Sequence, residues 1–396
     1  QIPEYDMRYP DLLYQYYYYT GKTDALEEFY EVAEKAAAHW EEYIDGTGLM
    51  TKPPLWSISD WPSSIVDDSG KYQTTMNLHM YDVFDKMSLI SEVLGKDAEA
   101  ASYRQKAEDI SAAITANLID PETGIYMDSY GSEKRNPGVT AFAIFLGQAP
   151  ESLRTQQLDY IAKTELESTS VLPSKVILTK PVLHVLLQGN DSHKEAAYEI
   201  MTRTTGLEWG RMVADGYQTC WEGFETINSH SHAWTAYPAK MFLAYLAGIT
   251  YNDVNYTGVQ VKPYLPADLS YVEGSLETPA GETIAVRLDK NQDNSKSLNV
   301  NTQVAARIGV PRFDMENTTV SLDGTVLFED GAATNTVEGI TYVGNDAQYI
   351  YFDVVAGNYT FDSAVKPAGT EESYTLTVNS NEGGKLLVNG KEITRS

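Results

Sequence analysis

The sequence predicts a mainly α-helical fold, a double ring of paired helices that is incomplete on its N-terminal side, followed by an antiparallel β-sandwich. Three observations support this prediction. The first part of the chain repeats an apolar helix, a glycine, a few polar residues and a second amphipathic helix. Beyond Gly248, short runs alternate apolar with polar residues between Gly, Asn and Asp turns. A chain of 396 residues also exceeds the size of most single cores, so we expect more than one domain.

Five glycines mark the corners at which one helix of a pair is expected to end: Gly21, Gly95, Gly147, Gly189 and Gly248. We expect each to adopt the left-handed conformation that stops a helix. This interpretation gives five helical hairpins in series and nine helices in all. A closed (α/α)6 toroid has twelve helices, so about three are missing on the N-terminal side.

The segment 217–237 carries the residues most typical of an active site. It places Glu222 between Trp221 and a glycine, and two histidines and another tryptophan follow within a dozen positions. An indole ring can stack on the apolar face of a sugar, while a carboxylate can accept a proton from water or hold a hydroxyl. We therefore expect a carbohydrate-active site around Glu222.

A second long connection, residues 46–73, has no helical or strand periodicity of its own and contains Trp56, Asp60 and Trp61. Long loops inside a compact framework of helices are commonly functional. We therefore expect both long connections to contribute to one site.

Strand-like runs extend over residues 250–364, where we expect the β-sandwich domain, after a helical domain over residues 1–249. Residues 365–396 begin with a Pro-Gly linker and contain two strand-like runs about an Asn-Glu-Gly-Gly turn. We expect them to start a further small β module.

Charge and composition exclude several classes of function. The chain has 29 Lys and Arg against 56 Asp and Glu, a net charge of −27, and the acidic residues are spread along it. Such a surface repels nucleic acid and anionic membranes, so we expect neither as a partner, and a neutral ligand fits better. The single cysteine, Cys220, excludes an intrachain disulfide and a Cys-based metal site. The sequence contains no HExxH, phosphate or dinucleotide motif, and we expect no metal or cofactor.

No apolar run reaches the roughly 18 residues of a membrane span, so we expect no membrane insertion. The first 30 residues lack the pattern of a signal peptide and are typical of the middle of a folded domain. Cysteine poverty is consistent with bacterial export, and we expect an extracellular, cell-surface or periplasmic protein. The oligomeric state is left open.

Five motifs follow one another along the chain: IPEYDMRYPDLLYQYYYYTGK, SISDWPS, TCWEGFE, SHAWTAYPAKMFL and GVQVKPYLPADLSYVEGSLETPAGETIAV. In order and spacing, over residues 1 to about 364, they resemble the bacterial α-L-rhamnosidases of glycoside hydrolase family 78. The resemblance implies an (α/α)6 barrel followed by a β-sandwich. It also implies hydrolysis of terminal α-L-rhamnosyl linkages in glycosides or polysaccharides, with inversion at the anomeric carbon.

The resemblance further implies roles for single residues. Glu222 matches the catalytic base, His232 matches a histidine that contacts substrate, and Asp60 and Trp61 match a pair lining the sugar pocket. The family's general acid lies in an arginine- and glutamate-rich motif upstream of the first barrel helices. That motif has no counterpart in this sequence, so no residue is assigned as the acid.

Each assignment competes with a structural interpretation. Glu222 could be a surface glutamate in a loop, His232 could cap the apolar helix that follows it, and Asp60 could form a helix cap or an Asx turn. Trp56 and Trp61 could simply close the mouth of the ring. In the functional interpretation they form, together with Trp221, the walls of the sugar site.

Two other functions stay open beside the rhamnosidase. Because the acid motif is missing, the chain could be a non-catalytic rhamnoside-binding relative or an inactive fragment. Because other six-hairpin hydrolases act on glucosides, trehalose or uronides, it could also cleave another sugar.

Overall fold

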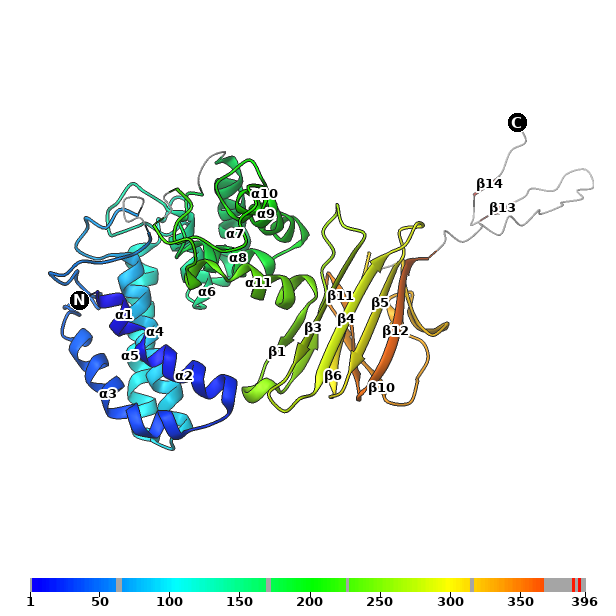
Figure 1. Cartoon of the computed structure of the whole chain (residues 1–396), viewed down its shortest axis with the longest axis horizontal. Helices are drawn as coiled ribbons and strands as arrows, with labels where there is room; N and C mark the ends of the chain where they lie inside the picture. The colour runs from blue at the N-terminus through cyan, green and yellow to red at the C-terminus, as the bar shows by residue number, and fades with distance from the viewer. Residues whose placement is uncertain are drawn as a thin grey trace, which may run out of the picture.

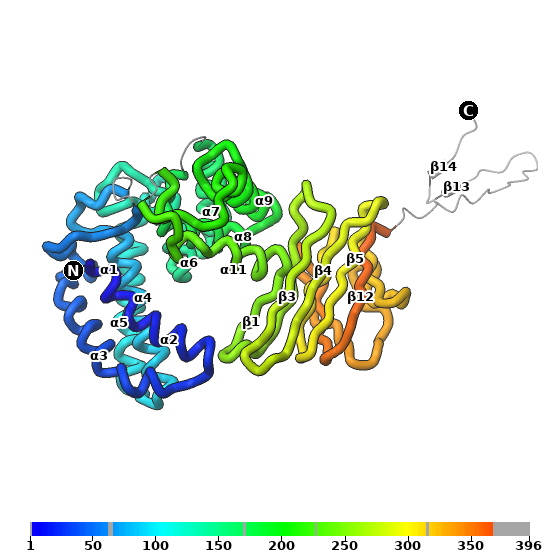
Figure 2. Tube along the Cα trace, viewed as in Figure 1, coloured from blue at the N-terminus to red at the C-terminus, as the bar shows by residue number. Residues whose placement is uncertain are grey.

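The computed structural model describes residues 2–61, 66–168, 172–225, 228–313 and 317–366, and two short strands near the C-terminus. Helices make up the first part of the chain and two β-sheets the second, which confirms the predicted fold class (Figure 1). The helices follow a curved arrangement, and the sheets stand to one side of them. The trace in Figure 2 shows the chain passing from the last helical segment into the sheets.

The described residues contain eleven α-helices. They are α1 (Pro3–Met7), α2 (Tyr9–Thr20), α3 (Asp24–Glu41), α4 (Thr74–Val93), α5 (Asp97–Leu118), α6 (Pro137–Phe145), α7 (Glu151–Glu167), α8 (Thr179–Leu187), α9 (Asp191–Thr202), α10 (Trp209–Ala214) and α11 (Pro238–Met241). A 3-10 helix (Ala233–Thr235) precedes α11 and a π-helix (Phe242–Leu246) follows it.

The longer helices pack as successive hairpins, α2 with α3, α4 with α5, α6 with α7 and α8 with α9. The second helix of a pair is amphipathic: α5 buries one stripe, which includes Tyr103, Ala107, Ile110 and Ile114. The first helices α4, α6 and α8 are buried on most faces and contact their neighbours in the ring. This is the inner and outer arrangement that the sequence predicts.

The glycine corners are confirmed at three of the hairpins. Gly21, Gly95 and Gly147 have φ of 69°, 68° and 72°, in the left-handed region that ends a helix. Gly248 is also left-handed, with φ 76°, but strand β1 follows it. This is the change from helices to strands that the sequence predicts after Gly248, so the described residues form four helical hairpins rather than the five expected.

The expectation for Gly189 is also wrong, because its φ is not positive. The side chain of Asn190 caps α9 by accepting the backbone N–H of His193 at 3.1 Å, and the His193 ring folds back toward Gly189. A Cβ at position 189 would lie 2.5 Å from His193 Nδ1. Glycine is needed here for close packing rather than for a left-handed turn.

Two sheets form the β part. The five-stranded sheet has the order β1-β2-β6-β11-β10 and the seven-stranded sheet the order β3-β4-β5-β12-β7-β8-β9. The strands are β1 (Ile249–Tyr251), β2 (Val259–Val261), β3 (Tyr271–Glu277), β4 (Thr283–Lys290), β5 (Lys296–Thr302), β6 (Ala306–Pro311), β7 (Thr318–Leu322), β8 (Thr325–Glu329), β9 (Ala332–Ala333), β10 (Ile340–Asn345), β11 (Tyr349–Val354) and β12 (Gly357–Val365).

The sheets share a core that includes Ile284, Leu298, Ile308 and Phe361. All strand pairs of the two sheets are antiparallel except β2 with β6, which run parallel because β3 to β5 of the other sheet lie between them in the sequence. Near the C-terminus, β13 (Leu387–Val388) pairs with β14 (Lys391–Glu392). The predicted Asn-Glu-Gly-Gly turn lies outside the described residues.

The helical and β parts meet around Gly248 and the tyrosines of α2. Tyr18 donates a hydrogen bond to the carbonyl oxygen of Tyr251 at 3.1 Å, and the two rings stack at 5.9 Å. The backbone N–H of Lys262 donates to the carbonyl of Gly248 at 2.8 Å. A Cβ on Gly248 would lie 2.2 Å from the Lys262 carbonyl carbon, so backbone of the two parts is in direct contact here.

Gly248→Ala should destabilise the protein much more than Gly95→Ala. Both glycines are left-handed, which costs alanine roughly 1–2 kcal/mol, but only Gly248 has backbone where the Cβ would sit, whereas position 95 is open. Urea unfolding of both variants measures the difference in unfolding free energy. Equal losses would contradict the close backbone contact.

A buried carboxyl on α7 makes stability depend on pH. Glu165 is fully buried, and its Oε1 accepts the backbone N–H of Ser174 at 3.1 Å while Oε2 has no partner. Desolvation raises the pKa of Glu165 to about 8, and the nearby Asp60 charge raises it further. The folded state thus keeps a proton that the unfolded chain releases near its ordinary pKa of roughly 4.3.

Protonated Glu165 stabilises the folded state fully at pH below its unfolded pKa. This stabilisation is lost as the pH rises through its folded pKa of about 8. Glu165→Gln should therefore flatten the fall in unfolding free energy between about pH 4.5 and 8, by up to roughly 1.4 kcal/mol per pH unit. Denaturant unfolding across this range measures the slope. The exposed Glu167→Gln on the same helix is the control, and an unchanged slope in Glu165→Gln would refute the assignment.

Candidate active site

The segment that carries Glu222 is a long loop between α10 and the 3-10 helix, as the sequence predicts, and hydrogen bonds close it on itself. The backbone N–H of Glu222 donates to the carbonyl of Ser229 at 2.9 Å, and that of His232 donates to Cys220 at 2.8 Å. The Thr235 hydroxyl donates to the carbonyl of Trp221 at 2.6 Å. The backbone on both sides of Glu222 is therefore fixed without a helix or strand.

The Glu222 carboxylate is half-buried and makes no hydrogen bond or ion pair with any residue that the structure describes. Its backbone carbonyl accepts a hydrogen bond from Trp234 Nε1 at 2.7 Å. Trp221, just before it, and Phe224, two positions after it, are buried and pack into the core. The backbone of Glu222 is thus held next to an apolar region, and its carboxylate is left without a partner among the described residues.

Trp234 brings residues of the two long loops together. Its ring centroid lies 6.5 Å from that of Trp61 and 4.1 Å from that of His232, and Trp56 lies 6.4 Å from Trp61. Three of the predicted site residues, Trp56, Trp61 and His232, therefore form one aromatic cluster with Trp234. The predicted Trp221 lies apart from this cluster and packs against Tyr217, at 4.5 Å between ring centroids.

Asp60 is a buried residue that fixes the long loop of residues 46–73. Only 1% of the residue is exposed, and its carboxylate accepts backbone N–H groups from Trp61, Lys175 and Ile177, each at 2.8 Å. Burial nevertheless raises the pKa of Asp60 to about 7. These contacts fix the backbone of Trp61 against the segment that precedes α8.

His232 has the capping role that competes with its predicted contact to substrate. It is the N-cap of the 3-10 helix, and its Nδ1 accepts the backbone N–H of Trp234 at 3.4 Å. The ring is half-exposed beside the Trp234 ring. Capping and contact with a sugar are compatible here, because the same ring that caps also borders the indole.

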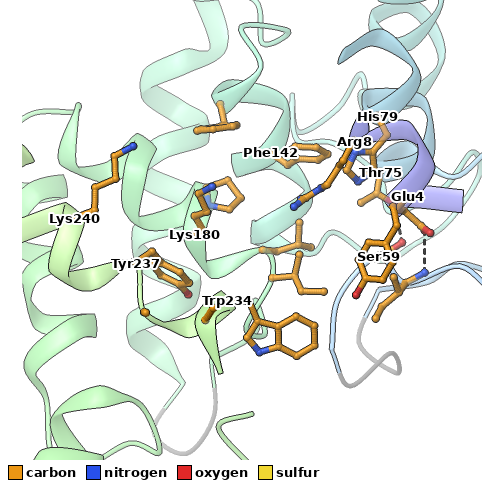
Figure 3. A pocket seen from close by; sticks show the side chains of 18 residues that line it. Glu4, Arg8, Ser59, Thr75, His79, Phe142, Lys180, Trp234, Tyr237 and Lys240 are labelled. Carbon is orange, nitrogen blue, oxygen red and sulfur yellow. Dashed lines mark hydrogen bonds between the residues drawn. The ribbon is translucent and has the colours of Figure 1, made fainter. Parts of the chain in front are cut away.

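A cavity of about 470 Å³ opens on the other side of Trp234 (Figure 3). Helices α1, α4, α6 and α8 and the segments around residues 58 and 233–240 form its walls. Its lining includes Glu4, Arg8, Ser59, Thr75, His79, Phe142, Lys180, Trp234, Tyr237 and Lys240. The cavity is therefore bordered by α4, α6 and α8, the first helices of their pairs, and by Trp234; Glu222 itself is not among its lining residues.

Glu4 and His79 are two buried polar residues of this cavity that sequence reasoning did not select. Glu4 Oε1 accepts hydrogen bonds from the Ser57 hydroxyl at 2.5 Å and from the Ile58 backbone N–H at 2.9 Å, while Oε2 has no partner. Burial lowers the pKa of His79 to about 3, so its ring is neutral, and it lies 4.9 Å from the Phe142 ring. A buried histidine within an apolar helix was the sequence signal that could have identified this wall.

The helical part matches a known family model. Residues 3–246 match the bacterial alpha-L-rhamnosidase 6 hairpin glycosidase domain. An alpha-L-rhamnosidase of Formosa agariphila is 22% identical over 366 residues, which cover 88% of this chain and 37% of the relative. The chain thus spans well under half the length of that relative.

Two solved structures share the fold. An alpha-L-rhamnosidase from Dictyoglumus thermophilum superposes with a TM-score of 0.73 and 20% identity, over 90% of this chain and 39% of the other. The Streptomyces avermitilis alpha-L-rhamnosidase complexed with L-rhamnose gives a TM-score of 0.70 and 18% identity, over 87% and 31% of the two chains. With the family model matching more than half of its residues, the chain belongs to the bacterial α-L-rhamnosidase six-hairpin glycosidase family.

Proposed function

We propose that this chain carries the catalytic base and the sugar-binding wall of an α-L-rhamnosidase that inverts the anomeric centre. Two observations support the proposal: Glu222 is partly buried with a carboxylate that has no partner among the described residues, and its backbone carbonyl is hydrogen-bonded to the Trp234 indole. Membership of the rhamnosidase family supports α-L-rhamnosyl units as the sugar. Terminal rhamnose on a glycoside or polysaccharide is the proposed substrate.

In this mechanism Glu222 acts on water rather than on the sugar. Its carboxylate removes a proton from a water molecule as that water attacks the anomeric carbon, and the bond to the leaving oxygen breaks on the opposite face. A second, protonated carboxyl roughly 6.5–9.5 Å away donates the proton to the leaving oxygen. The space between the two carboxyls is what admits the water.

The proposal does not assign the proton donor to a residue of this chain. Glu4 is the acidic residue among the described residues that line the cavity, but two hydrogen bonds commit its Oε1 to holding the loop at Ser57 and Ile58. We assign it to positioning that loop. Trp61 and Trp234 supply the apolar wall of the site, and Trp56 lies at the rim of this wall. Trp221, the residue before Glu222, packs into the core.

Asp60 and His232 act in the proposal mainly through these tryptophans. The backbone contacts of Asp60 fix Trp61, and the His232 cap fixes Trp234. His232 is also exposed enough to hydrogen-bond a sugar hydroxyl. Removing either side chain should therefore weaken sugar binding more than it slows the chemical step.

A rhamnoside-binding protein without catalysis is the second candidate. It is favoured by one observation: among the described residues that line the cavity only Glu4 is acidic, and its Oε1 already accepts two hydrogen bonds. Release of nitrophenol from 4-nitrophenyl α-L-rhamnoside separates the two, because a binder retains affinity for the glycoside and releases no nitrophenol. A panel of other aryl glycosides tests whether a different sugar is cleaved.

We further propose a bacterial source and an exported location, extracellular, cell-surface or periplasmic. Cysteine poverty and the bacterial family support this. None of the described helices combines the length and apolar character that crossing a membrane requires.

Glu222→Gln should lower kcat on 4-nitrophenyl α-L-rhamnoside by at least about 10²–10⁴-fold, because it removes the proton acceptor at nearly constant volume. The melting temperature and rhamnose affinity should stay close to those of the unmodified chain. Stopped assays of nitrophenol release give the rate.

Glu225→Gln is the matched control three residues away. It removes an ion pair with Lys175, at 2.8 Å, but no proposed base, and should change kcat by less than tenfold. Full activity in Glu222→Gln, or equal losses in both variants, would remove Glu222 from the role of base.

A further inference from the structure

A fully buried threonine lies at the centre of the hydrogen bonds that hold the Glu222 loop. Thr235 is the last residue of the 3-10 helix and directly follows Trp234. Its hydroxyl lies 2.6 Å from the carbonyl oxygen of Trp221 and 3.0 Å from that of His232. A hydroxyl has one proton to donate, and the shorter distance indicates Trp221 as the main acceptor. Because Thr235 is buried, it can affect a bound sugar only through its neighbours.

The carbonyl that Thr235 holds belongs to the peptide unit that leads into Glu222. On the opposite side of this planar unit, the Glu222 N–H donates to the carbonyl of Ser229 at 2.9 Å. The next peptide unit is fixed as well, because the Glu222 carbonyl accepts a hydrogen bond from Trp234 Nε1 at 2.7 Å. Both peptide units that flank the proposed base are therefore held from residues 229–235.

The local sequence does little to fix this backbone by itself. Gly223 directly follows the base, and glycine allows more backbone conformations than any other residue. Among the described residues, neither a helix nor a strand contains Glu222. The direction of the Glu222 side chain thus depends on the hydrogen bonds to its flanking peptide units.

Trp209, the first residue of α10, supports Thr235 from the core. Its Nε1 donates to the carbonyl of Thr235 at 2.8 Å, and the residue is buried. Its ring lies edge-on to that of Phe224, two positions after Glu222, with 4.9 Å between the centroids. Trp209 therefore fixes Thr235 and also packs against the part of the loop that follows the base.

The start of α10 is itself anchored by a buried ion pair. Glu208 is fully buried, and its carboxylate accepts hydrogen bonds from Arg203 at 3.1 and 3.3 Å. Removing one partner of such a pair is strongly destabilising, so the pair holds its place. Trp209 is thus connected to the helical core, and Thr235 is connected to the core through Trp209.

We propose that Thr235 is a positioning residue for the base, and that Trp209 supports it in this role. The inference rests on the proposed function and adds a requirement: the Glu222 carboxylate is aimed at water only while the Thr235 hydroxyl holds the preceding peptide unit. A displacement of roughly 1 Å can slow a reaction by about 10²-fold. Substrate binding should change little, because neither Thr235 nor Trp209 is among the described residues that line the cavity.

The test uses hydrolysis of α-L-rhamnosyl fluoride by the full chain. Fluoride leaves without taking up a proton, so this reaction needs the base and not the unassigned acid. The water oxygen bonds to the anomeric carbon as the carbon–fluorine bond breaks, and Glu222 takes the proton of the water. A fluoride electrode measures the release and gives kcat and KM.

Thr235→Val removes the hydroxyl at nearly constant shape and should lower kcat about tenfold or more, while KM stays within about twofold. Thr235→Ser keeps the hydroxyl and should retain at least about a third of the rate. Trp209→Phe removes only the indole donor and should lower kcat roughly three- to tenfold. Melting temperatures show that each variant folds, and Trp209→Phe tests the same series of contacts if Thr235→Val does not fold.

Thr302→Val in β5 is the matched control. Thr302 is also buried, and its hydroxyl donates to the backbone carbonyl of Val304 at 2.7 Å. This variant should lose stability without a change in kcat per folded molecule. The inference is overturned by the same kcat in Thr235→Val and Thr302→Val, by equal losses in Thr235→Val and Thr235→Ser, or by a loss confined to KM.

Glu222→Gln in the same assay separates this inference from the proposed function. If Glu222→Gln stops fluoride release while Thr235→Val and Trp209→Phe keep the full rate, the base stands and the positioning role fails. If Glu222→Gln releases fluoride at the full rate, or the unmodified chain releases none, the proposed function fails and the inference fails with it.

Discussion

The hydrogen bond from Trp234 Nε1 to the carbonyl oxygen of Glu222 is the contact on which the site depends. It fixes the proposed base and the aromatic wall relative to each other, because the donor is on the indole that lines the cavity and the acceptor is in the backbone of Glu222 itself. The loop contains no helix or strand in its described part, so these few hydrogen bonds replace the regular structure that positions most catalytic residues.

The other long loop, residues 46–73, illustrates how buried polar groups fix irregular backbone. Asp60 spends its carboxylate oxygens on three backbone N–H groups, and Glu4 spends one oxygen on the segment just before it. Desolvation of Asp60 and Glu165 opposes folding at neutral pH, which a loop of ordinary polar residues would avoid. The structure thus gives up some stability to hold Trp61 and its neighbours in place beside the cavity.

Sequence reasoning predicted the architecture well because helix and strand periodicity are local properties. The helical pairs, the change to strands after Gly248 and the two long loops are all present. It failed at Gly189, which the tertiary contact with the His193 ring requires, and nothing in the sequence indicated that Trp234 lines the cavity whereas Trp221 does not. Whether the predicted residues act on a sugar stays a prediction.

A crystal structure of the chain soaked with L-rhamnose tests the central claim most directly. We expect the sugar ring to lie against the indole of Trp234, with the Glu222 carboxylate directed toward a water molecule near the anomeric carbon. Rhamnose bound away from Trp234, for example on the β-sheets, with Glu222 turned away from it, would contradict the account.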